Sequence, residues 1–291
     1  MKEKENIKII ECPRDAMQGI KEFIPTVAKA EYINKLLEVG FDTIDFGSFV
    51  SPKAIPQMRD TADLLSLLKL EDTNSKLLAI VANLRGATDA SSFEEIKYLG
   101  FPFSISEEFQ QRNTGSSIEE SLGRVEAIQE VCLKNNKEMV VYISMAFGNP
   151  YGELWHPDIA LEWSEKLFDK LGIKIIALSD TIGVSNPENI SAMFKAVSLE
   201  INSVEFGVHL HTVKEKALEK VEAAYQAGCR RFDGAIKGYG GCPMAKDNLT
   251  GNMPTEIMID YFQEKGILSD LSLNKFSDSL LIAGNLFDTY H

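Results

Sequence analysis

The chain alternates short β-branched or aromatic runs with longer amphipathic segments, and this alternation restricts the possible folds. It predicts eight strands, at residues 7–12, 43–48, 77–82, 100–106, 139–147, 175–180, 204–211 and 230–235. Helical patterns lie between them, including residues 30–37, 118–133, 161–171 and 216–227. Gly40, Gly172 and Gly228 follow three of these patterns, where glycine ends a helix because it enters the left-handed conformation cheaply. Ser117 is the expected N-cap of the helix that begins at Ile118.

Strands that alternate with helices about every 30 residues predict right-handed βαβ units and a parallel sheet. Eight such units fit a closed (β/α)₈ TIM barrel better than an open doubly wound sheet. A length of 291 residues would also allow two domains, but no linker or shift in composition divides the chain. We therefore expect one TIM-barrel domain over residues 1–291, with the barrel at about 6–235. A Gly-rich lid loop and a small C-terminal helical cap would occupy residues 236–291.

The composition is that of a soluble globular protein, with 44% hydrophobic and 25% charged residues. A formal charge of −13 without a basic stripe argues against nucleic acids and anionic membranes as partners. The sequence has neither a signal peptide pattern nor an apolar run of about 18 residues, the length that would span a membrane. Its four cysteines form no C-x-x-C pair, which favours reduced thiols in the cytoplasm.

In a barrel of this kind, working residues lie at the carboxyl ends of the strands and in the loops that follow. This rule selects a set of polar residues as the predicted site. The set consists of Arg14, Asp15, Asp45, Ser48, Asp180, His209, His211, Cys242 and Asn252.

The pair His209 and His211 is the most informative member of this set. Side chains at positions i and i+2 of a strand point to the same face, so both imidazoles can reach one ion. The alternative is that one or both are core histidines. Two imidazoles with carboxylate and amide oxygens suit Mg²⁺ or Mn²⁺, with Asp15 and Asn252 as the oxygen donors.

Arg14 would place a cation beside Asp15, where it can stabilise a developing oxyanion, although a surface ion pair is the commoner role of an arginine. The glycines around Cys242 suit a lid loop. Cys242 itself is either a proton donor or acceptor or a small loop residue. His156 and His291 have no visible partners, and we interpret them as structural or solvent-exposed.

Longer motifs across nearly the whole chain resemble the hydroxymethylglutaryl-CoA lyase family of the DRE-TIM metallolyase superfamily. They are PRDAMQ (13–18), SFVSPKAIPQM (48–58), SSIEES (116–121), SDTIGVSNP (179–187), HLH (209–211), GYGGCPMA (238–245) and GN (251–252). The cysteine loop sets this family apart from the related isopropylmalate and homocitrate synthases, which resemble it at RD and H-x-H.

The resemblance implies cleavage of 3-hydroxy-3-methylglutaryl-CoA to acetyl-CoA and acetoacetate by a retro-Claisen step that depends on Mg²⁺ or Mn²⁺. It also implies an acyl-CoA substrate and a homodimer. Roles carried over by resemblance are metal ligation for Asp15, His209, His211 and Asn252, catalysis for Arg14, Cys242, Asp45 and Asp180, and substrate binding for Gln18, Lys21 and Ser48.

The sequence departs from the family pattern around the site. Ala16 replaces a glycine, Asp45 a glutamate, Thr212 an aspartate and Asn149 a frequent cysteine. Two alternatives therefore stay open: a related aldolase or Claisen-type enzyme acting on another 3-hydroxyacyl-CoA or 2-oxo acid, and a catalytically silent homologue that binds metal or acyl-CoA.

A CoA substrate is itself strongly anionic, so its binding needs a local basic rim on this acidic chain. The candidates for this rim are Lys21, Lys53, Arg59, Arg85 and Lys237.

Overall fold

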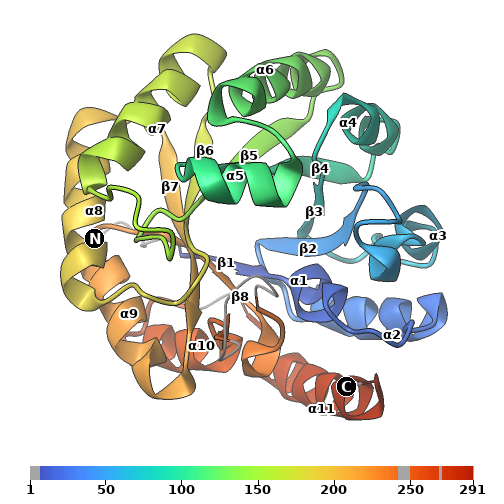
Figure 1. The fold of residues 1–291 in the computed structure, drawn as a ribbon. Coiled ribbons are helices and arrows are strands. Elements are labelled where there is room, and N and C mark those ends of the chain that lie inside the picture. The colour runs from blue at the N-terminus through green and yellow to red at the C-terminus, as the bar shows by residue number, and fades with distance from the viewer. Residues whose placement is uncertain (1–6, 242–249, 269–270, 291) are drawn as a thin grey trace.

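A closed barrel of parallel strands forms the centre of the protein in a computed structural model that describes residues 7–241, 250–268 and 271–290 (Figure 1). Within these residues β1 pairs with both β2 and β8, and β6 with β7, so the sheet has closed on itself. The TIM barrel and all eight predicted strands are confirmed. They are β1 (Lys8–Glu11), β2 (Thr43–Ser48), β3 (Lys76–Ile80), β4 (Ile96–Ser104), β5 (Glu138–Ser144), β6 (Ile175–Asp180), β7 (Glu205–Thr212) and β8 (Arg231–Gly234).

Helices surround the barrel, and their ends follow local sequence signals. Ser117 accepts a hydrogen bond from the Glu120 N–H and donates its own N–H to the Glu120 carboxylate, which makes a capping box. Gly172 ends its helix with a φ of 67°. The helices are α1 (Pro13–Gln18), α2 (Thr26–Leu37), α3 (Thr61–Leu65), α4 (Leu84–Ser91), α5 (Glu107–Thr114), α6 (Ile118–Lys134), α7 (Pro157–Leu171), α8 (Pro187–Glu200), α9 (Lys214–Gln226), α10 (Thr255–Glu264) and α11 (Leu273–Tyr290).

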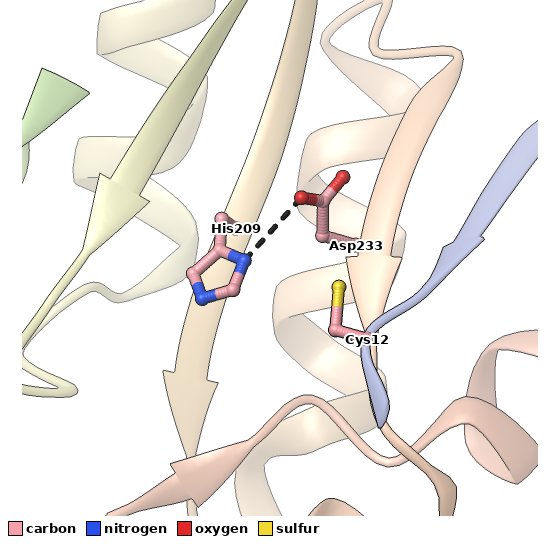
Figure 2. A group of neighbouring side chains, drawn as sticks. All are labelled: Cys12, His209 and Asp233. Carbon is pink, nitrogen blue, oxygen red and sulfur yellow. Dashed lines mark hydrogen bonds and ion pairs between the residues drawn. The ribbon is translucent and has the colours of Figure 1, made fainter. Parts of the chain in front are cut away.

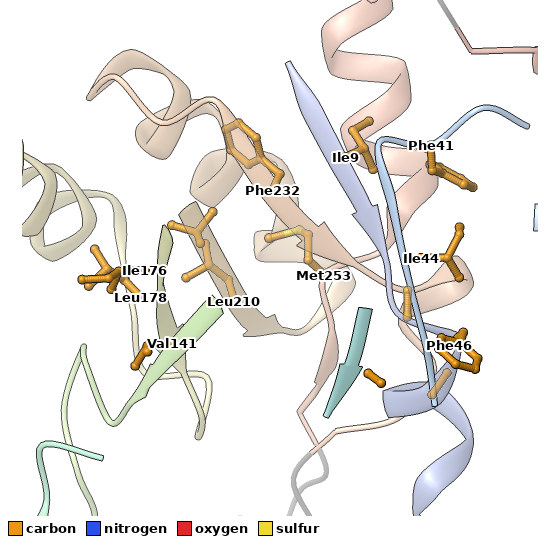
Figure 3. Packing of buried hydrophobic residues seen from close by; sticks show 14 of the residues in the cluster. Ile9, Phe41, Ile44, Phe46, Val141, Ile176, Leu178, Leu210, Phe232 and Met253 are labelled. Atoms are coloured by element: carbon orange, nitrogen blue, oxygen red, sulfur yellow. The ribbon is translucent and has the colours of Figure 1, made fainter. Parts of the chain in front are cut away.

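Alternate residues of each strand enter different cores. Leu77 and Ala79 of β3 point outward into the large core between strands and helices, part of which Figure 3 shows. Leu78 and Ile80 point inward, where they join Tyr142 and other side chains inside the barrel. This period of two fills the interior of the barrel with side chains.

The segment after β8 completes the site end of the barrel. The short strand β9 (Gly251–Asn252) runs antiparallel to the end of β7 and pairs Asn252 with His211. The 3₁₀ helix η2 (Ile236–Gly238) leads to Tyr239, whose ring stacks on Phe287 of α11 with 4.1 Å between the centroids. Helix α11 also packs against α2 (Figure 1).

Among the described residues, no helix combines the length and the apolar character needed to cross a membrane.

Candidate functional site

The short helix α1 places a charged cluster at the end of β1. It begins at Pro13, separated from the end of β1 by a single residue, and Arg14 and Asp15 are buried beside Asp45 of β2. The Arg14 guanidinium donates from Nε and Nη2 to the Asp45 carboxylate at 3.1 and 2.5 Å. Its Nη1 donates to Asp15 and to Gln18, both at 2.9 Å. The sequence predicted this group of four residues, and the structure brings it together.

The two carboxylates of this cluster differ in their pKa values. Burial raises the pKa of both, but for Asp15 the nearby Arg14 and the two histidines prevail and lower its pKa to about 2. Burial prevails at Asp45, although Arg14 opposes it, and raises the pKa to about 6. Asp15 is therefore the carboxylate that is held ionised for a cation.

His209 and His211 point toward the same end of the barrel, with 5.3 Å between their ring centroids. The Nδ1 atom of His211 is 3.1 Å from the carbonyl oxygen of Thr181, and its buried Nε2 has no partner among the described residues. Burial and the neighbouring His209 lower the pKa of His211 to about 4. His211 is therefore neutral, and its Nε2 lone pair is available.

His209 is oriented by a carboxylate that the sequence analysis did not select. Its Nδ1 atom is 3.3 Å from Oδ2 of Asp233 on β8 (Figure 2). Burial lowers the pKa of His209, but the hydrogen bond and the charge of Asp233 prevail and raise it. Asp233 lies at the end of the eighth predicted strand, so the rule that selected the other site residues applied to it as well.

Donor atoms of Asp15, His209 and His211 lie within 4.8 Å of one another. The Asn252 amide donates to Asp15 Oδ2 at 2.7 Å and to the Tyr239 carbonyl at 2.8 Å, which leaves its side-chain oxygen as a further donor to an ion. The unpartnered Nε2 of buried His211 fits a bound cation, because a buried polar atom without a partner is costly. Two imidazoles with carboxylate and amide oxygens suit a divalent ion.

A cavity of about 460 Å³ opens beside these donors. Its polar wall includes Arg14, Asp15, Gln18, His209 and His211. The remaining wall is formed by residues that the sequence analysis did not select, among them Phe109, Asn113, Tyr142, Ser144 and Thr181. Ser144 and Thr181 are polar residues at or directly after the ends of β5 and β6, so the selection of polar residues at strand ends could have found them. Phe109 and Asn113 belong to α5, and that selection does not cover helices.

Five described residues of the predicted site do not line this cavity, namely Lys21, Asp45, Ser48, Asp180 and Asn252. Two of them, Asp45 and Asn252, bond the lining residues Arg14 and Asp15. The Asp180 carboxylate accepts from the N–H groups of Val184 and Ser185 at 2.9 and 2.8 Å and from Lys220 Nζ at 3.1 Å. The buried Ser48 hydroxyl accepts from the Val50 N–H at 3.2 Å. Lys21 is exposed.

The predicted basic rim is scattered. Lys53 and Arg85 are exposed, and Lys53 precedes Ala54 and Ile55 of the cavity wall. The Arg59 guanidinium lies 3.6 Å from the centroid of the Phe23 ring. The exposed Lys237 has a left-handed φ of 55°.

The remaining predictions concern Cys242 with its lid loop and the two other histidines of the chain. Cys242 and much of the expected lid loop lie outside the described residues, as does His291. His156 is exposed and caps α7, which agrees with a structural role.

The departures from the family pattern are accommodated locally. Ala16 is helical within α1, so this position requires no positive φ. Although Asp45 is shorter than glutamate, it still reaches Arg14 through two oxygens. The Thr212 hydroxyl donates to the Val213 carbonyl at 3.0 Å. Asn149 holds its own loop by accepting from the N–H groups of Tyr151 and Glu153.

In the described residues, the closed barrel and the donors at its carboxyl-terminal end define a (β/α)₈-barrel protein with a candidate divalent-cation site. Such sites occur in enzymes of many reaction classes, so the fold alone leaves the reaction open. The chain belongs to the HMGL-like family, whose model matches residues 6–280.

Similar proteins carry lyase names. The rat protein named 3-hydroxy-3-methylglutaryl-CoA lyase, cytoplasmic, is 34% identical over 278 residues, which are 94% of this chain and 79% of the relative. The mitochondrial hydroxymethylglutaryl-CoA lyase of Pongo abelii is 35% identical over 283 residues, covering 96% and 84%. An HMG-CoA lyase structure from Acinetobacter baumannii, in complex with coenzyme A and 3-methylmalate, matches with a TM-score of 0.89 at 29% identity and covers 98% and 92%.

Proposed function

We propose that the protein cleaves 3-hydroxy-3-methylglutaryl-CoA to acetyl-CoA and acetoacetate by a retro-Claisen step. The observation that carries this proposal is the convergence of the Asp15, His209 and His211 donors with the Arg14 guanidinium on one cavity. A retro-Claisen step needs the tertiary hydroxyl to lose its proton while the enolate of the leaving thioester is stabilised. The lyase names of the relatives support the choice of this substrate.

Asp15, His209, His211 and the side-chain oxygen of Asn252 would hold the cation. A bound Mg²⁺ or Mn²⁺ would supply Lewis acidity, which lowers the pKa of the substrate hydroxyl and so favours loss of its proton. The cluster of Arg14, Asp15 and Asp45 carries one positive and two negative charges when both carboxylates are ionised. A divalent cation offsets this excess of negative charge, which would otherwise oppose formation of an enolate.

Arg14 is the residue that we assign to the enolate. A guanidinium has five N–H groups, and the bonds to Asp45, Asp15 and Gln18 engage four of them. One Nη2 N–H is left among the described partners, and Arg14 lines the cavity. Asp45 holds the guanidinium plane by its paired contacts, so that the remaining N–H is oriented before the enolate forms.

Three further roles rest on the family resemblance together with the positions of the residues. Cys242 would pass a proton to the enolate carbon. Gln18, which lines the cavity, would contact substrate. Asp180 and Ser48 are buried outside the cavity wall and would act by positioning their loops, and Lys21 would join the basic rim for the CoA phosphates.

The wider assignment follows the same family. We infer that residues 1–291 work as one catalytic domain, because α11 packs on α2 and on the Tyr239 segment. An acyl-CoA is the proposed partner, as the coenzyme A complex of the Acinetobacter relative suggests. We further propose a homodimer located in the cytoplasm, the location in the name of the rat relative.

Acetoacetate release from 3-hydroxy-3-methylglutaryl-CoA, with Mg²⁺ or Mn²⁺ supplied, tests the function. We expect turnover with at least one of the two ions and its loss in Arg14→Gln, while Lys134→Gln, an exposed change on α6, keeps the wild-type rate. A folded protein that binds metal and produces no acetoacetate would refute the proposal. Release of free CoA from other 3-hydroxyacyl-CoA substrates would then identify a related Claisen-type enzyme.

A further inference from the structure

A second group of metal-binding side chains shares His209 with the first. Donor atoms of Cys12, His209 and Asp233 also lie within 4.8 Å of one another. Cys12 follows β1 and Asp233 lies on β8, and Figure 2 shows the thiol and the carboxylate on the same side of the His209 ring. Cys12 is 1% exposed and Asp233 is 2% exposed, and of the three residues only His209 lines the cavity.

Two ligand atoms of this group are available for an ion. Oδ1 of Asp233 is buried and has no hydrogen-bond partner in the described part of the chain. Among the described residues, the Cys12 thiol makes one hydrogen-bond contact, a long one to the Ile10 carbonyl with 3.7 Å between Sγ and O. Burial and then the negative charges of Asp233, Asp45 and Asp15 raise the pKa of this thiol well above its usual value, and Arg14 opposes them, so the thiolate forms only when a cation binds beside it.

The donor chemistry differs from that of the first group. Carboxylate and amide oxygens with imidazoles suit Mg²⁺ or Mn²⁺, whereas a thiolate with an imidazole and a carboxylate selects softer ions. We propose that Cys12, His209 and Asp233 form a second site, which takes a thiophilic divalent cation such as Zn²⁺ or Cd²⁺ and whose occupation excludes the ion of the Asp15 site. On binding, the Cys12 thiol proton leaves to solvent and the thiolate becomes a ligand.

The exclusion follows from the single lone pair of a neutral imidazole. Nδ1 of His209 faces Asp233, so Nε2 is the nitrogen left for the Asp15 site. An ion that takes Nδ1 requires the ring proton to move to Nε2, and a protonated Nε2 cannot be a ligand. His209 can therefore serve one of the two sites at a time, and a thiophilic ion would inhibit the enzyme. The inhibition rests on the proposed function, whereas the binding does not.

Cadmium titration of the metal-free protein, followed by the ultraviolet absorption of the cadmium–thiolate bond, tests the site. We expect a one-equivalent absorption change in the wild type, its loss in Cys12→Ser and in Cys12→Ala, and its retention in Cys229→Ser and Cys242→Ser. Two Cys12 variants are used because one of them could fail to fold. A folded variant should bind Mn²⁺ with an affinity within about threefold of that of the wild type. Absence of the band in the wild type, or its persistence without Cys12, would overturn the proposal.

The exclusion has its own measurement, which needs no substrate. Protein loaded with one equivalent of Mn²⁺ should release that ion, detected by its electron paramagnetic resonance, in proportion to the cadmium–thiolate band. A ternary complex that holds both ions would refute the shared-imidazole argument. Failure of acetoacetate production with both metal results intact would refute the proposed function alone.

Discussion

The ends of β1 and β6 both carry a buried carboxylate paired with a cation, yet the two pairs differ in what remains free. Arg14 bonds Asp45 and Asp15 at the end of β1, and Lys220 bonds Asp180 at the end of β6 with 3.1 Å between Nζ and Oδ2. The sequence pattern treated both strand ends alike and predicted all three aspartates, Asp15, Asp45 and Asp180, as site residues.

The two cations differ in how many of their N–H groups already have a hydrogen-bond partner. Besides Asp180, Lys220 Nζ donates to the His211 carbonyl at 2.9 Å and to the Gly183 carbonyl at 3.4 Å, which accounts for its three N–H groups. Arg14, which lines the cavity, retains one N–H without a partner among the described residues. A saturated pair holds a loop in place, whereas an unsaturated one can bind a ligand. Substitutions of Arg14 and Lys220 test this distinction, and substitutions of Asp233 and Glu11 extend it to other buried carboxylates.

Arg14→Gln should have the largest effect. Loss of the guanidinium removes the donor to the enolate, and removal of one such donor costs about 10²- to 10³-fold in kcat. Steady-state acetoacetate assays measure this loss, and calorimetric Mn²⁺ titration should show metal binding within about threefold of the wild type. Arg14→Lys, which keeps the charge without the paired N–H groups, should fall in between. Wild-type turnover in Arg14→Gln would contradict the assignment.

Lys220→Met should mainly reduce stability. It leaves the buried Asp180 carboxylate without its cation, and breaking a buried ion pair costs about 3 kcal/mol or more of the free energy of unfolding. Urea denaturation measures this change. The kcat of the folded fraction should stay within about threefold of the wild type, because Lys220 does not line the cavity. A loss of turnover as large as that of Arg14→Gln, with stability unchanged, would reverse the comparison.

Asp233→Asn should weaken metal binding at the Asp15 site. The carboxylate orients His209 through Nδ1, and loss of such a partner typically costs about 10- to 100-fold in metal affinity. Mn²⁺ titration of the wild type and the variant measures the ratio, and Asp63→Asn, on the exposed face of α3, is the control. Equal affinities would show that the histidine needs no such support.

Glu11→Gln tests a further buried carboxylate, one whose two hydrogen bonds come from the Ile236 N–H and the Thr255 hydroxyl. Burial prevails over these hydrogen bonds and raises the pKa of Glu11 to about 8, above its unfolded value of 4.5. Between these two values the unfolded chain ionises this group and the folded protein does not. The stability contributed by the neutral carboxyl is therefore fully present below pH 4.5 and is lost as the pH rises toward 8.

In the wild type, this one group should lower the free energy of unfolding by about 1.4 kcal/mol per pH unit between these two pKa values, and the glutamine variant should lack this dependence. Urea denaturation of both proteins at several pH values within this range gives the difference in slope. Parallel stability profiles would mean that Glu11 is ionised in the folded protein.

Local signals predicted the elements of this fold well. The strand at residues 175–180 is β6 itself, and the helices at 118–133 and 161–171 end within a few residues of the observed α6 and α7. These boundaries depend on the alternation of apolar residues and on caps such as Ser117 and Gly172, which act over a few residues of chain. The His209 and His211 pair was predictable for the same reason, since both belong to one strand.

Contacts between segments far apart in the sequence were harder to predict. The neighbourhood of Cys12, His209 and Asp233 joins β1, β7 and β8, and it depends on the register that pairs His209 with Asp233 across β7 and β8. Sequence alone does not reveal this register. The role of Asp180 was obscured for a related reason, because Lys220, its partner, lies 40 residues away on α9.

The sequence by itself determined the barrel and the residue types at its carboxyl-terminal end, because strand period and helix stops are local properties of the chain. The tertiary structure decided which of those side chains keep unsatisfied donors and lone pairs. That outcome depends on hydrogen bonds between segments far apart in sequence: Asp15 with Asn252, His209 with Asp233, and Asp180 with Lys220. A strand end therefore becomes a binding site only where closure of the barrel leaves such groups facing a cavity.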